Sequence, residues 1–236
     1  MRIIPKQYQE LELIFESINS EKARCIAFAS PNGHSGATSL AISVAKRLSG
    51  RNERVLVIDL NTCNPFTGSD IITMPNSLAK WSFGDISCQL NAQSIDDFYF
   101  LSITQLQDLA LVREKDVFDM AILMLKQEFD YILFDMSPIC KRNHANFPLH
   151  LLMSVTDLLL LDIALGKTTQ ETLDAVISEL KSAHCKRFEI VVSQMYMPPL
   201  GERLIDSINR RFRRLPKVKH RLINIVNRQQ WLFQGV

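Results

Sequence analysis

Short, almost wholly apolar runs recur along the chain, each bounded by turn residues. Each run has the length of a strand, and the lack of alternating polar positions is typical of strands buried on both faces of a parallel sheet. The runs cover residues 24–30, 54–60, 98–103, 130–136, 157–163 and 188–195. The pattern therefore predicts a strand at each of these places.

Longer amphipathic stretches lie between several of these runs. They predict helices over residues 38–48, 114–129, 168–184, 199–212 and 217–230, with a further helix within residues 1–22. Alternation of strands and helices favours an α/β fold with a mainly parallel, twisted sheet and helices on both faces. Without a convincing linker or repeat, residues 1–236 are predicted to form a single domain, with the basic helices of residues 201–236 in its core. Residues 61–97 are the least regular part and are expected to contain a loop over the site.

Composition changes this picture little. Hydrophobic residues make up 47% of the chain and charged residues 22%, which is ordinary for a globular fold. No apolar run approaches the roughly 18 residues that span a bilayer. The five cysteines form no CxxC pair, so neither a zinc site nor a disulfide framework is indicated. The N-terminus lacks the pattern of a signal peptide, and we expect a cytoplasmic protein.

Charge is distributed unevenly. Residues 201–236 carry nine Lys or Arg and two Asp or Glu, a net charge of +7, against −5 for the rest of the chain. Such a basic end suits the phosphates of lipid or nucleic acid, while a solvated helix face explains it equally well. The arginines concerned are Arg210, Arg211, Arg213 and Arg214. The apolar positions of the last helix fit core packing or contact with a membrane surface.

The stretch "SPNGHSGATSLA", residues 30–41, has the outline of a phosphate-binding loop. It follows a predicted strand, carries glycines and leads into a predicted helix. In such loops backbone N–H groups and the helix dipole hold phosphate, a lysine adds charge, and Ser or Thr binds Mg²⁺. Gly36 and Thr38 stand where a G-K-[ST] ending requires them, but Ala37 replaces the lysine. A turn without a ligand is the alternative.

Two aspartates later in the sequence support a binding site at this loop. Asp59 and Asp135 each come near the end of a later predicted strand. Because ligands of parallel α/β sheets bind at the carboxyl ends of the strands, both side chains are expected beside the loop. A carboxylate at such a place also caps neighbouring helices, which is the structural alternative.

Taken in order, these segments resemble the MinD/ParA superfamily of deviant Walker ATPases. That group includes the bacterial tyrosine kinases of polysaccharide export and the CpaE/TadZ proteins of pilus localisation. The loop resembles the Walker A segment, "VLVIDLNTCNP" the Walker A′ segment and "FDYILFDMSP" the Walker B segment. "TDLLLLDIALGKTTQETLDAV" resembles the strand and helix that follow, and residues 213–232 resemble the C-terminal pattern of CpaE- and MinD-like proteins.

The resemblance implies ATP or ADP with Mg²⁺ as cofactor. It assigns Mg²⁺ to Thr38 and Asp135, and the positioning of water to Asp59. Gln194 falls near the position of the family's adenine-contacting Asn. The implied nucleotide-binding residues of the loop are Asn32, Gly33, His34, Ser35, Gly36, Ala37, Thr38 and Ser39.

The chain also departs from the family pattern. Asn32 and Ala37 replace the two lysines of the loop, and His34 replaces a middle glycine. Since phosphoryl transfer depends mostly on electrostatic stabilisation, efficient ATP hydrolysis is not expected. Some CpaE/TadZ-like and cellulose-secretion relatives also have lysine-free loops of the G-[AT]-[ST] type, so nucleotide binding stays open.

These features favour a catalytically degenerate MinD/ParA-like protein. It is expected to act as a regulatory or localising partner in a cell-envelope machine, either exopolysaccharide secretion or pilus assembly. We expect a homodimer or hetero-oligomer, with peripheral membrane contact as an open question. Two alternatives stand beside this interpretation: a weak or partner-activated ATPase or tyrosine-kinase-like export regulator, and a ParA-like DNA-binding partition protein.

Overall fold

The computed structural model describes residues 9–68, 79–83, 91–107, 113–141, 143–193, 199–213 and 216–233. The strands are β1 (Cys25–Ala29), β2 (Val55–Leu60), β3 (Gln93–Ile95), β4 (Phe98–Ser102), β5 (Tyr131–Met136), β6 (Leu158–Ala164) and β7 (Phe188–Ser193). The helices are α1 (Gln9–Ser20), α2 (Ala37–Ser49), α5 (Lys115–Glu128), α6 (Leu149–Val155), α7 (Gln170–Ser182), α8 (Leu200–Arg211) and α9 (Pro216–Asn227). Two 3-10 helices, η1 (Ile103–Gln105) and η2 (Gln230–Phe233), complete the described elements.

Seven strands form one sheet in the order β3-β4-β2-β5-β1-β6-β7. β5 pairs in parallel with β1 and β2, which in turn pair in parallel with β6 and β4. β3 pairs antiparallel with β4. Every residue of β1 and β2 is buried, which explains why both read as continuous apolar runs. The parallel strands bring their carboxyl ends to one edge of the sheet, where ligands of such folds bind.

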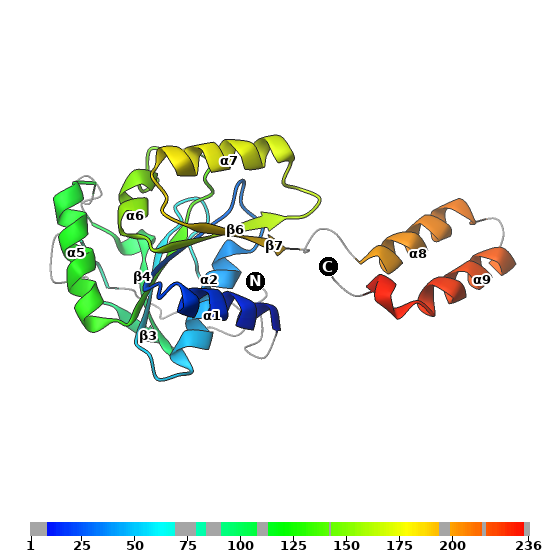
Figure 1. Cartoon of the computed structure of the whole chain (residues 1–236), viewed down its shortest axis with the longest axis horizontal. Helices are drawn as coiled ribbons and strands as arrows, with labels where there is room; N and C mark the ends of the chain where they lie inside the picture. Colours follow the sequence, from blue (N-terminus) through cyan, green and yellow to red (C-terminus); the bar gives the residue numbers. More distant parts are fainter. Residues whose placement is uncertain are drawn as a thin grey trace. The chain divides into compact units, whose positions relative to one another are not determined.

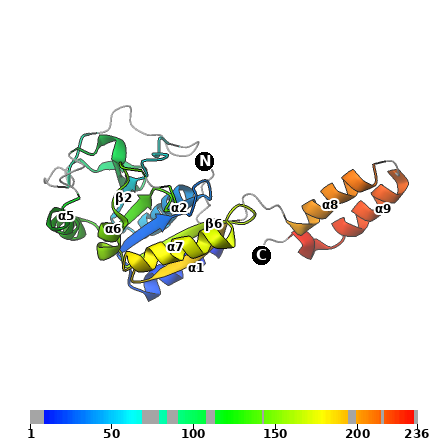
Figure 2. The same cartoon turned by 90° about the horizontal axis from the view of Figure 1, so that it is seen from above.

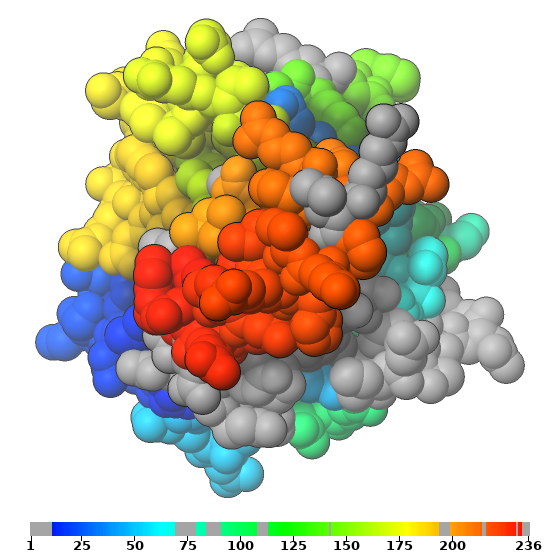
Figure 3. Space-filling model, turned by 90° about the vertical axis from the view of Figure 1, so that its right-hand side faces the viewer, coloured from blue at the N-terminus to red at the C-terminus, as the bar shows by residue number. Residues whose placement is uncertain are grey.

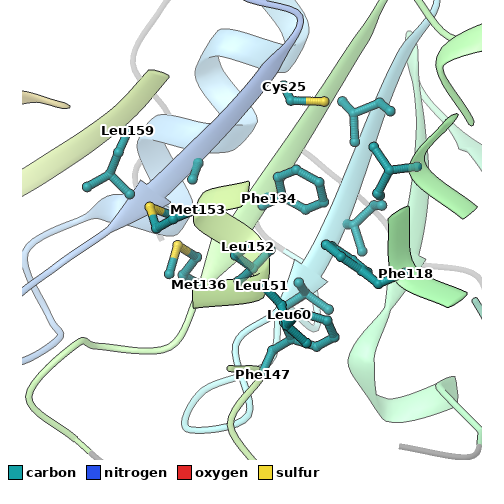
Figure 4. Close-up of a cluster of buried hydrophobic side chains, with 14 of the residues drawn as sticks. Cys25, Leu60, Phe118, Phe134, Met136, Phe147, Leu151, Leu152, Met153 and Leu159 are labelled. Carbon is teal, nitrogen blue, oxygen red and sulfur yellow. The ribbon is translucent and has the colours of Figure 1, made fainter. Parts of the chain in front are cut away.

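Helices cover both faces of the sheet (Figures 1 and 2). α1 and α2 pack on one face, and α5, α6 and α7 on the other. Figure 4 shows part of the second core, where Phe134 of β5 lies among side chains of α6 and near Phe118 of α5. The α/β fold with a P-loop NTPase-like sheet, predicted from the sequence, is therefore confirmed.

The chain divides into two compact units: residues 1–163 with 168–191, and residues 164–167 with 192–236. In the second unit α8 and α9 contact each other, and η2 contacts α8. Figure 3 shows the two helices side by side, in orange and red. No described helix is both long and apolar enough to span a bilayer.

The expectation that the helices of residues 201–236 belong to the core of a single domain stays a prediction. Within the described part of this segment, Gly201 is the buried residue of α8, and α9 has none. Each helix has an apolar side, as its periodicity indicated, and α8 and α9 pack on each other.

Candidate phosphate-binding site

The turn between β1 and α2, residues 30–36, has the backbone conformation of an anion-binding loop. Gly33, His34 and Gly36 have positive φ angles of 82°, 59° and 119°. Turns with left-handed residues direct successive N–H groups into one concavity. Gly36 is also the N-cap of α2 and has no side chain to bind the N–H groups of the first helical turn. Those N–H groups therefore lack a side-chain cap and suit an anion.

The remaining loop side chains differ in exposure. Asn32 and His34 are exposed, whereas Ser35 is buried. Ala37, which stands in place of the lysine, is 8% exposed, so neighbouring atoms already cover its methyl group. Ser39 lies in the first turn of α2, half-buried. The loop thus keeps its backbone geometry but contributes no cation of its own.

Thr38 and Asp135 meet at the base of the loop. The Thr38 hydroxyl donates to Asp135 Oδ2 at 2.7 Å. Asp135 is 1% exposed, and its second oxygen, Oδ1, has no hydrogen-bond partner among the described residues. A buried carboxylate oxygen without a partner is costly in a folded protein, and one explanation is a bound ion. The structure thus brings these two predicted residues together, and their binding of Mg²⁺ stays a prediction.

Asp59 pairs in register with Asp135 on the neighbouring strand β5. Its Oδ1 accepts from the Asn61 N–H at 2.9 Å, and its Oδ2 accepts from the Phe66 N–H at 2.8 Å. Both oxygens therefore hold the turn that follows β2. The resemblance assigns Asp59 to the positioning of water, and that role stays a prediction.

Burial governs the protonation of this pair. It raises the pKa of Asp59 to about 7, against the opposing effect of the two backbone N–H groups. The pKa of Asp135 lies well above its ordinary value, first because of burial and then because of the negative charge of Asp59, while the Thr38 hydroxyl acts in the other direction. A nearby cation would reverse these shifts, because it favours the ionised carboxylates.

Asp162, on β6, is a further buried carboxyl near the loop that the sequence analysis missed. It is 3% exposed, and burial raises its pKa to about 6, which the neighbouring Ser35 hydroxyl partly counters. No hydrogen bond within the described residues reaches Ser35 Oγ or Asp162 Oδ1. The available signal was a charged residue inside the otherwise apolar run "LLLLDIA".

A turn after β5 is fastened to the loop. The Ile139 N–H donates to the Ser30 carbonyl at 2.9 Å, and the Cys140 N–H donates to the Pro31 carbonyl at 3.0 Å. A Cβ added to Gly33 would lie 3.0 Å from Cγ of Pro138. Gly33 therefore serves both the positive φ angle and the close approach of a proline ring.

The oxygens of Thr38 and Asp135 supply some, but not all, of the ligands that Mg²⁺ requires. Oxygen ligands suit this ion, and it is commonly bound through one or two carboxylates together with substrate phosphates and water. Thr38 Oγ1 and the free oxygen of Asp135 would hold it here. No group of three or more His, Cys, Asp or Glu within the described ranges is arranged for a metal, so the ligand's own phosphates would have to complete the coordination.

Not all predicted residues fall in this site. Gln194 and Arg214 lie outside the described residues. Arg210, Arg211 and Arg213 are exposed in the second unit. A cavity of about 300 Å³ is lined in part by the turn after β5 and by no residue of the loop. It is lined by Leu60, Met136, Ser137, Pro138, Ile139, Asn143, Asn146, Phe147, Pro148, Leu149, Leu152 and Glu179.

A parallel sheet, a phosphate loop after its first strand and aspartates on two central strands define a P-loop NTPase-like protein of the MinD/ParA superfamily. Residues 23–190 match the model of the AAA_31 family, described as an AAA domain. This match covers more than half of the chain, and the chain belongs to that family. No curated protein matches the sequence.

Solved structures have the same fold at low identity. The kinase domain of Escherichia coli tyrosine kinase ETK is 14% identical, with a TM-score of 0.58 over 81% of this chain and 80% of that chain. A ParA family ATPase from Chlorobium tepidum TLS is 20% identical, with a TM-score of 0.50 over 72% of each chain. Cobyrinic acid a,c-diamide synthase from Mycobacterium smegmatis, with bound ADP and magnesium, is 17% identical, with a TM-score of 0.51 over 72% and 74%.

Proposed function

We propose that this protein binds a nucleoside diphosphate or triphosphate with Mg²⁺ without efficient hydrolysis, and that the bound state controls its association with a partner. The observation that carries the proposal is the contact of Thr38 with Asp135 beneath a loop without lysine. Loop N–H groups and Mg²⁺ suffice for binding phosphate, whereas phosphoryl transfer also needs positive charge on the moving group. Binding therefore survives the loss of lysine better than turnover does.

The hydrogen bonds of Asp59 support the loss of hydrolysis. Both of its oxygens accept backbone N–H groups of the turn after β2, which holds the carboxyl group against that turn. A pKa of about 7 also leaves this carboxyl partly protonated at neutral pH. A general base has to be ionised and within reach of its water.

The partner belongs, in this proposal, to an envelope machine for exopolysaccharide secretion or pilus assembly. The motif resemblance to export-associated kinases and CpaE/TadZ proteins supports it, as does the fold shared with a tyrosine kinase domain. The protein would work as a dimer or hetero-oligomer in the cytoplasm, beside the inner face of the membrane.

Titration of a fluorescent ADP analogue with Mg²⁺ tests the nucleotide part. We expect saturable micromolar binding that EDTA abolishes and that Thr38→Ala weakens at least about tenfold. The matched control is Thr104→Ala, at a threonine of η1 outside the loop. Absence of saturable binding by the wild type would refute the proposal.

Phosphate release separates the proposal from the ATPase alternative. We expect no release above the protein-free rate for the wild type, and no change for Asp59→Ala. Release that a partner stimulates and Asp59→Ala abolishes would establish the ATPase instead.

Cross-linking in the native host tests the partner. We expect the wild type to recover a component of an envelope machine and Thr38→Ala to recover none.

The alternative of a DNA-binding protein can be tested through the exposed arginines of the second unit. Arg210, Arg211 and Arg213 are exposed, and phosphate contacts make binding fall steeply with salt. Changing these three residues to glutamine leaves duplex affinity unaffected if the proposal is right. Salt-dependent duplex binding that the triple variant loses would favour a partition protein.

A further inference from the structure

Lys141 lies over the phosphate loop, although it belongs to a different segment of the chain. Its Nζ atom is 3.6 Å from the position that a Cβ on Gly33 would occupy. The side chain is exposed, and no hydrogen bond or ion pair within the described part of the chain engages its ammonium group. A cation is therefore held close to a loop that has none of its own.

The backbone around Lys141 is anchored on both sides. Its N–H donates to the Pro138 carbonyl at 3.0 Å, which closes the turn after β5, and its carbonyl accepts from Asn146 Nδ2 at 2.6 Å. The same turn is hydrogen-bonded to the Ser30 and Pro31 carbonyls at the start of the loop. Because of these bonds, the position of the lysine backbone relative to the loop is set by the fold.

The groups around the loop are mostly acidic, so a nearby lysine would balance their charge. Three buried carboxyl groups, those of Asp59, Asp135 and Asp162, belong to strands that end beside the loop. Loop residues 30–38 contain no Lys or Arg. Ser35, 2% exposed, lies beside Asp162, and its hydroxyl favours the ionised form of that carboxyl. An anionic ligand needs compensating positive charge in such surroundings.

We propose that Lys141 binds the phosphate chain of the ligand, and so supplies from the turn after β5 the positive charge that Asn32 and Ala37 no longer provide. The ligand class is a polyphosphate anion, in the first place a nucleoside diphosphate or triphosphate with Mg²⁺. The choice of a nucleotide as ligand rests on the proposed function, whereas the choice of a polyphosphate anion does not. The tip of the Lys141 side chain already lies beside Gly33 of the loop, so this lysine does not need the buried position of residue 37 to come close to the loop.

Calorimetric titration of Lys141→Gln tests the assignment. The probes are MgATP, MgADP and magnesium pyrophosphate. Because a hydrogen bond to a charged group is lost, we expect binding to weaken about 10- to 100-fold. Lys141→Arg keeps the charge and is expected to stay within about fivefold of the wild type. Lys186→Gln is the matched control: Lys186 is an exposed loop lysine before β7, at the opposite edge of the sheet, and its loss is expected to change affinity less than about twofold.

The outcomes separate this inference from the proposed function. If the wild type binds nucleotide and Lys141→Gln binds it as tightly as Lys186→Gln does, the role of Lys141 is overturned and the proposed function stands. If only pyrophosphate binds, and does so through Lys141, the inference stands and the nucleotide proposal falls. If none of the three probes binds to the wild type, both are overturned.

A second measurement does not depend on affinity. Acetylation of surface lysines followed by mass spectrometry reports how accessible each ammonium group is. We expect saturating MgADP or pyrophosphate to protect Lys141 at least about fivefold and to leave Lys186 unchanged. Equal acetylation of Lys141 with and without the bound probe would contradict a direct contact. The urea midpoint of Lys141→Gln should equal that of the wild type, because the ammonium group has no partner within the described residues to lose.

Discussion

Replacement of Asp162 by asparagine is expected to stabilise the protein at alkaline pH and to have little effect in acid. Asn has nearly the same shape as Asp but no charge. Asp162 is 3% exposed, and its Oδ1 has no partner among the described residues. The substitution therefore removes the cost of a buried charge while it leaves the packing of β6 in place.

The size of the effect follows from the pKa. Burial raises the pKa of Asp162 from 3.8 to about 6, so the folded protein holds this proton more tightly than the unfolded chain does. The stability that the proton contributes is complete below pH 3.8 and is lost as pH rises through about 6. At about 1.36 kcal/mol per pH unit, the loss is about 3 kcal/mol at pH 8 and about 0.6 kcal/mol at pH 4. These values are the largest gains that the variant can show.

Urea unfolding of the variant and the wild type, followed by the fluorescence of buried Trp81, measures the difference at a series of pH values. Subtraction removes the pH dependence of the other carboxyl groups, which both proteins share. Asp174→Asn, on the exposed side of α7, is the control and should show no pH-dependent difference. A difference for Asp162→Asn that stays constant from pH 4 to pH 8, or that favours the wild type at pH 8, would refute the reasoning.

Three further changes have distinct expected results. Thr38→Val leaves both oxygens of Asp135 unpaired and should cost about 1–3 kcal/mol in urea unfolding, more at high pH than at low. Gly33→Ala places a Cβ at a φ angle of 82° and should cost about 1–2 kcal/mol or more, whereas Gly50→Ala, at a φ angle of −64°, should be neutral or slightly stabilising. Trp81→Phe removes a buried hydrogen bond to a carbonyl of β4 and should cost about 1–3 kcal/mol, with nucleotide binding unchanged; weaker binding would mean that this region supports the loop.

The strong elements of the fold were predictable from local pattern. All six predicted strands are present, and within the described residues their ends lie at most two residues from those expected. β3 and α6 were missed because three residues and seven residues, respectively, are too short to show a period.

The position of a site residue could be predicted where that residue stands at the end of a predicted parallel strand. Thr38 and Asp135 are hydrogen-bonded because a parallel sheet brings the ends of separate strands to one edge. Asp162 and Lys141 were not foreseen. The first looked like an interruption of an apolar run, and the second comes close to the loop only through the hydrogen bonds of a turn. Tertiary contacts of this kind leave no periodic trace in the sequence.

Under the proposed function, the hydrogen bonds of Asp59 set a condition for designing an ATPase from this fold. Lysine at residue 37 would supply positive charge but would leave both oxygens of Asp59 bonded to the N–H groups of Asn61 and Phe66. A designed enzyme would therefore also need another group to hold the turn after β2, so that the carboxyl group could turn toward the ligand.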